Sequence, residues 1–308
     1  MSKAIPFDLA TFDQFRRGPR YLNASWVLER LGNKWWVASQ APLPQTVHAF
    51  LSLICQPVTL PPPSILPNPP SRSPTTQVRT VVQLTRDVEG GRRKAHPYFP
   101  NEVGQSLVVP PDDSEGGSPA LSVTLLKSED VPDCKCTKST ISVVPISNTS
   151  TPNQSATIFT HLAYLAWPDH GVPEEEDRAS LFNFIHLADT INRDRSLSSY
   201  PPSSTPDPNL DPDPPIIVGC SAGVGRTGSF IALSSLLRHY GELPPPAFPT
   251  PASVLPPSAL GPLPQELQED LIVQEIDSLR EQRQRMVDRP EQTILIYEML
   301  LEFLSRSA

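Results

Sequence analysis

Several features that mark other protein classes are scarce in this sequence. It has only four cysteines, Cys55, Cys134, Cys136 and Cys220, and their spacing suggests no disulfide framework. It has no dense block of Lys and Arg and a formal net charge of -8, so the electrostatic footprint of a nucleic-acid or membrane partner is missing. No apolar run approaches the ~20 residues that span a bilayer, and the N-terminus lacks the pattern of a signal peptide. We therefore expect a soluble cytoplasmic protein, with the nucleus left open as a second location.

Proline, by contrast, is abundant, with 39 residues that gather in a few tracts. Four segments rich in Pro, Ser and Asp stand out, at residues 57–77, 101–120, 196–215 and 241–264. Proline removes a backbone donor, and stretches with few large apolar residues cannot offset their ordering entropy. We predict that these segments are disordered insertions. Their proline runs could bind proline-reading domains, although a linker role is the simpler interpretation.

Between these segments the hydrophobic periodicity predicts strands and helices. Buried strands are expected at residues 35–38, 80–84, 121–126, 141–146, 158–166 and 215–218. Helices are expected at residues 43–54, 174–193, 228–240, 265–285 and 290–305. Strands and helices mix without strict alternation, which favours a single α/β (α+β) domain with a central mixed twisted sheet flanked by helices.

The most informative stretch begins with the apolar strand at residues 215–218 and continues into small residues and a helical pattern. It reads Gly219, Cys220, Ser221, Ala222, Gly223, Val224, Gly225, Arg226, Thr227 and Gly228. Glycines in such a loop let successive backbone N–H groups turn inward, and the following helix adds its positive dipole end. The pattern predicts a cradle for a dianionic phosphate, bound by residues 221–226.

Chemistry gives roles to three side chains of this loop. Cys220 lies at the rim of the anion site, where the same field favours the thiolate over the thiol and supplies a nucleophile. Arg226 can hold two phosphate oxygens with its planar fork. Thr227 offers a hydroxyl to the leaving sulfur. A lone cysteine is usually an inert buried thiol, but the arginine spacing and the glycines after a strand argue against that interpretation.

These residues resemble the signature of the cysteine-dependent protein tyrosine phosphatase family. Tyr21 to Ser25 and Ala38 to Thr46 are similar to two further segments of the family, in the family's order. The resemblance covers residues 20–305 with the insertions omitted and is to a fungal-like member with proline-rich insertions. It implies a single phosphatase catalytic domain that acts on phosphotyrosine proteins and needs no metal or cofactor. The family's N-terminal phosphotyrosine-recognition loop has no counterpart before Tyr21, so we expect it to be missing.

The resemblance also suggests supporting residues. Trp167, Pro168 and Asp169 resemble the family's mobile acid loop, in which Asp169 would protonate the tyrosyl oxygen and then activate water. Glu89 matches a glutamate that pairs with the catalytic arginine, and Lys94 a lysine that approaches the acid loop. Gln292 matches a glutamine near the hydrolytic water.

Two departures from the family pattern bear on activity. Gly219 stands where the family has histidine, so one group that favours the thiolate is absent. Asp288 replaces the first water-positioning glutamine, and its carboxylate would repel phosphate and hydroxide.

The sequence therefore predicts phosphotyrosine hydrolysis through a cysteinyl-phosphate intermediate. A dual-specificity or phosphoinositide phosphatase is the enzymatic alternative, since the missing loop leaves the depth of the pocket open. A catalytically impaired phosphotyrosine-binding protein and a scaffold that works through its proline tracts also remain.

Overall fold

The protein's computed structural model describes residues 22–60, 62, 76–111, 118–146, 156–168, 171–205 and 207–307. The strands are β1 (Ala24–Leu28), β2 (Trp35–Gln40), β3 (Pro57–Val58), β4 (Thr76–Gln77), β5 (Thr80–Gln83), β6 (Val88–Glu89), β7 (Arg92–Arg93), β8 (Ser106–Val109), β9 (Ala120–Val131), β10 (Cys136–Ile146), β11 (Thr157–Tyr164) and β12 (Ile216–Cys220). The α-helices are α1 (Val47–Ile54), α2 (Glu175–Arg193), α3 (Gly225–His239), α4 (Leu271–Gln282) and α5 (Pro290–Ser307).

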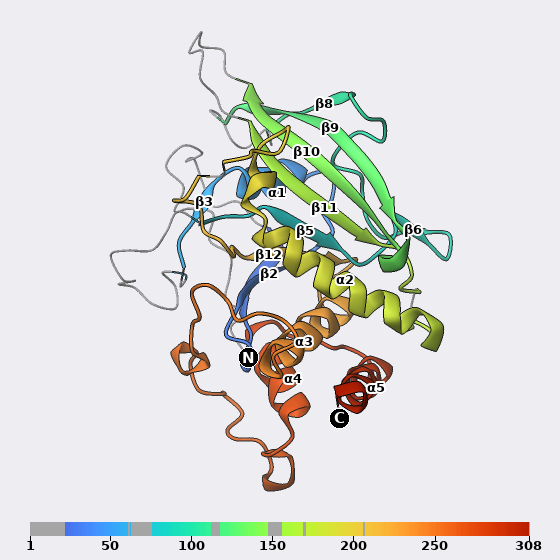
Figure 1. Ribbon diagram of the computed structural model, residues 1–308, viewed down its shortest axis with the longest axis vertical. Helices are drawn as coiled ribbons and strands as arrows, with labels where there is room; N and C mark the ends of the chain where they lie inside the picture. Colours follow the sequence, from blue (N-terminus) through green and yellow to red (C-terminus); the bar gives the residue numbers. More distant parts are fainter. Residues whose placement is uncertain are drawn as a thin grey trace.

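One sheet organises the molecule, with strand order β1-β2-β12-β5-β11-β10-β9-β8 (Figure 1). Strand β12 lies between β2 and β5 and runs parallel to both, whereas β8 to β11 form antiparallel pairs. Strand β12 is apolar because a central parallel strand is covered on both faces. This mixed sheet flanked by helices confirms the predicted fold class.

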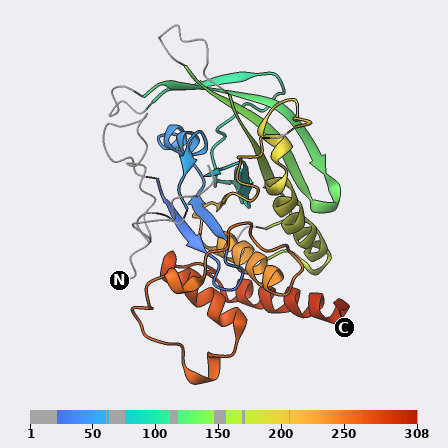
Figure 2. The same cartoon turned by 60° about the vertical axis from the view of Figure 1, so that its left-hand side comes forward.

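Each face of the sheet carries its own hydrophobic core. Side chains alternate along a strand, so Trp36 joins the core under α2, α3, α4 and α5, while Trp35 and Val37 join the core under α1. Figure 2 shows α1 and α3 on opposite sides of β2. The parallel centre of the sheet, where β12 ends, is thereby held rigidly from both faces.

The edge strand β1 is closed by a side chain. The carboxamide of Gln282 accepts a hydrogen bond from Leu28 N at 2.7 Å and donates one to Leu28 O at 2.9 Å. These two bonds are of the kind that a neighbouring strand would form. They occupy backbone groups at an edge that could otherwise pair with another strand. Helix α4 is thus fixed to the same end of the sheet as β2 and β12.

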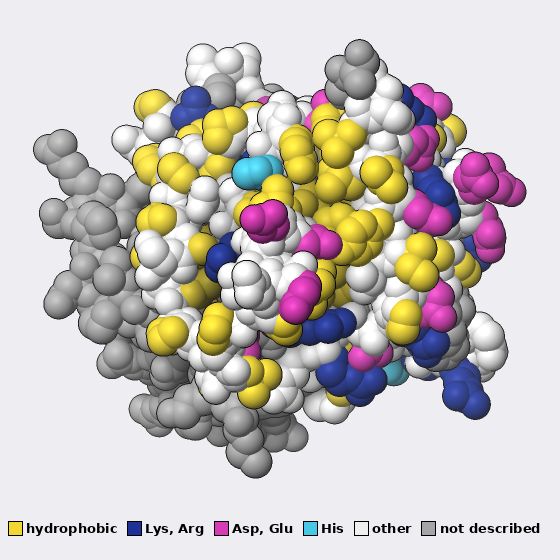
Figure 3. Space-filling view, turned by 90° about the horizontal axis from the view of Figure 1, so that it is seen from below, with side chains coloured by type: hydrophobic (Ala, Val, Ile, Leu, Met, Phe, Trp, Pro, Cys, Tyr) yellow, Lys and Arg dark blue, Asp and Glu magenta, His cyan; other side chains and the backbone are white. Residues whose placement is uncertain are grey.

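Hydrophobic side chains gather on the face seen from below in Figure 3. Helix α5 lies at this end of the molecule (Figure 1) and leaves Ile294, Leu301 and Leu304 exposed. Within the residues described, every helix is too short or too polar to form a transmembrane span.

The prediction of disorder is wrong for much of the proline-rich sequence. Strand β8 lies within residues 101–120 and pairs with β9. Within 196–215, Asp211 and Asp213 are buried, and within 241–264, Leu243 and Thr250 are buried. Of residues 57–77, only the ends are described as strands β3 and β4, while 61 and 63–75, with most of the first proline run, lie outside the described residues.

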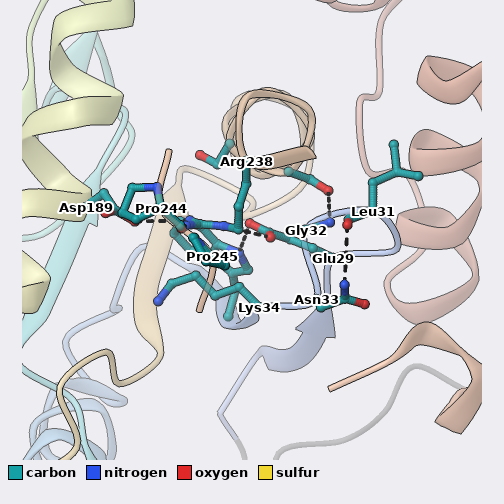
Figure 4. Close-up of polar contacts among 12 residues, drawn as sticks. Glu29, Leu31, Gly32, Asn33, Lys34, Asp189, Arg238, Pro244 and Pro245 are labelled. Carbon is teal, nitrogen blue, oxygen red and sulfur yellow. Dashed lines mark hydrogen bonds and ion pairs between the residues drawn. The ribbon is translucent and has the colours of Figure 1, made fainter. Parts of the chain in front are cut away.

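Charged side chains hold parts of the segments 196–215 and 241–264 against the helices (Figure 4). Arg193 donates from Nη2 to Asp213 Oδ2 at 2.9 Å and to Pro245 O at 3.0 Å. Arg238 donates to Asp189 Oδ1 at 3.1 Å, to Glu29 Oε2 at 3.2 Å and to the carbonyl of Pro244. A composition-based argument gives no weight to such contacts, because it counts only apolar side chains.

The helix predictions need smaller corrections. Helix α1 begins at Val47 rather than at residue 43, after a turn in which Leu43 N donates to Thr46 Oγ1 at 3.0 Å. Helix α4 is shorter than the predicted 265–285, because Asp270 caps its N-terminus and accepts from Ile272 N and Val273 N. Helix α3 begins at Gly225 rather than at 228.

Candidate active site

The predicted phosphate loop joins the central strand β12 to the N-terminus of α3. Cys220 ends β12 and is 6% exposed, and residues 221–224 connect it to Gly225, the first residue of the helix. The start of the loop is bonded to the residue that follows β2, because Ala41 N donates to Cys220 O at 2.9 Å. The cysteine thus stands at the carboxyl end of a parallel strand, where ligands of open α/β sheets commonly bind.

Two glycines of this loop are required by the packing. Gly223 has φ +70°, and a Cβ there would lie 2.3 Å from the backbone carbonyl of Ser39 in β2. At Gly228 a Cβ would lie 2.4 Å from Val287 N. Val287 is itself β-branched, buried and strained at φ +53°. The loop is therefore pressed between β2 and the segment before α5.

The backbone of the loop presents donors without acceptors. Across the part of the chain that the structure describes, no group accepts a hydrogen bond from the N–H of residues 221–225. Further along, Gly228 N donates to Val224 O at 2.7 Å. Successive free N–H groups at the positive end of a helix form an anion site.

Arg226 lies beside this site in the first turn of α3 and is buried. Its Nη1 donates to Leu84 O at 2.9 Å and its Nη2 to Pro168 O at 2.9 Å. Both nitrogens also bond Glu89, from Nη1 to Oε1 at 2.8 Å and from Nη2 to Oε2 at 2.9 Å. This bidentate pair fixes the plane of the guanidinium.

Glu89 is held in turn by its surroundings. Burial by itself raises the pKa of the Glu89 carboxyl, but hydrogen bonds from Arg226 and from Arg86 N outweigh burial, so the pKa lies below its ordinary value. Glu89 is therefore an ionised carboxylate at neutral pH, so its bonds with Arg226 form an ion pair.

Asp169, the predicted proton donor, lies outside the described residues, as do His170 and Tyr21. The residues that flank Asp169 are described. Trp167 is buried against Tyr164, and its Nε1 donates to Gly171 O at 3.1 Å across the gap in the described chain. Since Pro168 also bonds Arg226, the predicted acid segment starts in direct contact with the arginine.

The other predicted residues surround the same loop. Thr227 is fully buried, and its Oγ1 bonds no group among the residues described. Gln292 is buried with its carboxamide over Gly225, where an added Cβ would meet it at 2.9 Å. Lys94 is half-buried and follows the β6–β7 hairpin that carries Glu89, and its N donates to Asp87 O at 2.8 Å.

Arg283 was missed by sequence reasoning. Its Nε donates to Gly223 O at 2.7 Å and its Nη2 to Ala222 O at 3.1 Å, so it holds the outer side of the phosphate loop. The same guanidinium bonds Asn23 Oδ1 at 2.8 Å and Ser25 Oγ at 3.1 Å in the chain leading into and along β1. Arg283 follows α4 in a segment without a motif, so no local signal identified it.

The two departures from the family pattern have structural correlates. At Gly219 a Cβ would lie 2.7 Å from Ser39 O in the neighbouring strand, so the local packing requires a residue without a side chain. The Asp288 carboxylate turns to Arg285, which donates from Nε at 2.7 Å and from Nη2 at 3.2 Å. Its charge is thereby partly neutralised.

Comparisons with known proteins agree with this arrangement. The model of the protein-tyrosine phosphatase family matches residues 75–248, more than half of the chain. Tyrosine-protein phosphatase non-receptor type 9 of Mus musculus is 28% identical over 286 residues, which cover 93% of this chain and 37% of that protein. Tyrosine-protein phosphatase non-receptor type 14 of Homo sapiens is 27% identical over 294 residues, 93% of this chain and 19% of that protein. This chain therefore spans well under half the length of these relatives.

Solved structures share the fold. The protein tyrosine phosphatase of Trypanosoma cruzi superposes with a TM-score of 0.65 at 23% identity. The superposition includes 98% of this chain and 80% of the Trypanosoma cruzi chain. The protein tyrosine phosphatase of Trypanosoma brucei gives a TM-score of 0.61 at 25% identity, with 92% and 74% covered. With the matching family model and the cradle beside Cys220, these likenesses lead to one conclusion: the chain belongs to the protein-tyrosine phosphatase family.

Proposed function

We propose that the chain hydrolyses phosphotyrosine in proteins through a cysteinyl-phosphate intermediate. The observation that carries the proposal is the grouping of three features: Cys220, the N–H groups of residues 221–225, which have no acceptor among the described residues, and the Arg226 guanidinium held by Glu89. Pure phosphate binding would need the amides and the arginine but not a cysteine at the end of the strand.

In the first step the Cys220 thiolate attacks phosphorus while the bond from phosphorus to the tyrosyl oxygen breaks. Asp169 gives its proton to that oxygen, so that a phenol leaves instead of a phenolate. The loop amides and Arg226 stabilise the charge on the equatorial oxygens in the transition state. Because Pro168 bonds Arg226, binding of phosphate by the arginine and placement of the acid segment are physically connected.

In the second step water attacks phosphorus, Asp169 takes the proton of the water, and the bond from phosphorus to sulfur breaks. Gln292 would orient that water, and its burial beside Gly225 supports this role. The unpaired hydroxyl of Thr227 is a donor for the returning thiolate. The ion pair between Arg285 and Asp288 weakens the repulsion that a carboxylate would exert on hydroxide.

The test is phosphate release from a phosphotyrosine peptide, followed from the burst phase onward. Cys220→Ser is expected to abolish release, and Asp169→Ala to lower kcat by about 10²-fold or more. Cys55→Ser and Asp207→Ala are matched controls, since both residues lie outside the site, and they should keep wild-type rates. Tight peptide binding without turnover would overturn the proposal in favour of a phosphotyrosine-binding protein.

Two alternatives are separated by substrate. A phosphothreonine peptide or a phosphoinositide hydrolysed as fast as the phosphotyrosine peptide would instead indicate a dual-specificity or phosphoinositide phosphatase. We favour phosphotyrosine because curated relatives aligned over 93% of the chain are named as tyrosine-protein phosphatases.

We also propose a cytoplasmic location and proline-reading partners. All four cysteines are free thiols, which suits a reducing compartment. Leu255 has the dihedral angles of polyproline II and leads into exposed Pro256 and Pro257. Binding of an SH3 or WW domain to the chain, and loss of that binding in a double Pro256→Ala, Pro257→Ala variant, would support the partner proposal.

A further inference from the structure

The β6–β7 hairpin carries charges that the proposed reaction does not use. Its two strands are joined by Gly90 and Gly91, which have φ +54° and +73°, the geometry of a tight type I′ turn. The hairpin lies at the edge of the molecule in Figure 1. Because Glu89 is bonded to Arg226, this hairpin is fixed relative to the phosphate loop.

The register of the hairpin assigns its two arginines to different faces. Glu89 is paired with Arg92, and Val88 with Arg93. Residues directly opposite each other in an antiparallel pair project from the same face, with Cβ atoms about 4.5–5.5 Å apart. Glu89 is buried toward Arg226, whereas Val88 is 49% exposed. Arg92 therefore stands on the face that looks toward the active site, and Arg93 on the face that looks to solvent.

Arg92 and Arg93 have no counter-charge in contact with them within the described part of the chain. Both are exposed, and no carboxylate among the described residues forms an ion pair with either. By contrast, the buried Arg226 and Arg238 do have carboxylate partners. Arg92 is thus a free guanidinium next to the pair that positions the phosphate clamp, and a guanidinium binds carboxylates with a planar pair of donors.

We propose that Arg92 recognises an acidic side chain that flanks the phosphotyrosine in the substrate. The inference rests on the proposed function and names its substrate class. An extended peptide rises about 3.3 Å per residue, so the positions to test are the carboxylates within about three residues of the phosphotyrosine. Arg93, on the opposite face, does not take part.

The experiment uses three phosphotyrosine peptides of equal length whose flanking positions carry Glu, Gln or Lys. The kcat/KM ratio of the Glu peptide to the Gln peptide is measured for the wild-type chain, Arg92→Ala and Arg93→Ala. We expect a ratio of about three to five for the wild type, the size of an exposed ion pair, and a ratio near one for Arg92→Ala. Arg93→Ala should retain the wild-type ratio. High salt should lower the wild-type ratio, because exposed charges are screened.

The hydrolysis of p-nitrophenyl phosphate controls for folding and for the catalytic machinery, and it should be equal in all three proteins. Equal ratios for the wild type and Arg92→Ala, or the same loss in Arg93→Ala as in Arg92→Ala, would overturn the assignment to Arg92. Failure of the wild type to hydrolyse any of the three peptides would overturn the proposed function itself, and this inference with it.

Discussion

Glu89 touches no reacting atom in the proposed mechanism, yet it fixes the group that does. Without its carboxylate, the buried Arg226 would lose the bidentate bond that fixes the plane of its fork, and the single bonds to the carbonyls of Leu84 and Pro168 orient it less firmly. We expect Glu89→Ala to lower kcat on a phosphotyrosine peptide by about 10²-fold, the usual effect of a misplaced catalytic group. Glu89→Gln, which keeps one acceptor oxygen, should recover part of the rate. A rate in Glu89→Ala equal to that of the wild type would contradict the positioning role.

The same pair makes stability depend on pH. Because the folded-state pKa of Glu89 is lowered, the pair contributes stability above the ordinary carboxyl value near 4.5, and this contribution is lost as pH falls through the folded pKa. Urea unfolding of the wild type and Glu89→Gln should therefore differ most at pH 7. The two free energies of unfolding should converge in acid, and a difference independent of pH would rule out the ionised pair.

The packing of β2 against β12 explains why position 219 is a glycine. A Cβ at this position would lie 2.7 Å from the carbonyl oxygen of Ser39, so β12 and β2 would have to separate. We expect Gly219→Ala to lower the free energy of unfolding by about 1–3 kcal/mol, as overpacking does. At Gly104 an added Cβ meets open space, but φ is +86°. Gly104→Ala should therefore lower the free energy of unfolding only by the cost of a left-handed backbone conformation, about 1 kcal/mol. A smaller loss for Gly219→Ala than for Gly104→Ala, measured by urea unfolding, would contradict the steric argument.

At the scale of elements, Arg283 joins the phosphate loop to the chain around β1. It holds the carbonyls of Ala222 and Gly223 outward, and this orientation turns the adjoining N–H groups toward the cradle. We expect Arg283→Ala to raise the inhibition constant of orthovanadate about tenfold, corresponding to about 1.4 kcal/mol. Arg283→Lys should not restore binding, because an ammonium cannot bond all of these acceptors. Arg306→Ala, a change at an exposed residue of α5, is the control, and unchanged inhibition in Arg283→Ala would refute the clamp.

The sequence predicted most of the central elements, because β12 begins with an apolar run, β5 and β11 are rich in β-branched and aromatic residues, and α2 and α5 keep a helical period. Prediction from the sequence failed where the structure of a segment depends on contacts with residues far away in the sequence. Asp211 and Asp213 look like solvated turn residues, but Thr76, Lys34 and Arg193 bind them in the interior.

Within the site, the cysteine loop could be recognised because its residues are consecutive. The contact of Glu89 with Arg226 was expected only from resemblance, since 137 residues separate the two. Arg283 could not be found, because a clamp that bonds backbone carbonyls requires an arginine at one place in space and leaves no pattern in the sequence.

At the scale of the whole molecule, Glu275 couples α4 to the turn between β1 and β2. It is fully buried and accepts from Leu31 N at 3.0 Å and Arg30 N at 3.2 Å, and burial raises its pKa to about 8. A carboxyl whose folded pKa is raised stabilises the fold below its ordinary value near 4.5, and that contribution is lost as pH rises toward 8.

Glu275→Gln removes this titration and should therefore become more stable relative to the wild type as pH rises. We expect the difference between their free energies of unfolding to grow by ~3 kcal/mol from pH 5 to pH 8.5. Urea unfolding at both pH values measures the difference. Parallel pH dependence in the two proteins would mean that Glu275 stays ionised in the fold.

The charge cluster of Figure 4 has a consequence for how the chain folds. Its members come from separate segments of the sequence: Glu29 and Lys34, Asp189 and Arg193 in α2, Asp213, and Arg238 with the Pro244 carbonyl. Apart from the pair of Asp189 and Arg193 within α2, these pairs join segments far apart in the sequence. A buried charge that loses its partner costs several kcal/mol. Partial opening of any one segment is therefore penalised by all the others. The chain should form this cluster late, when long-range contacts close, and should unfold in a single cooperative step.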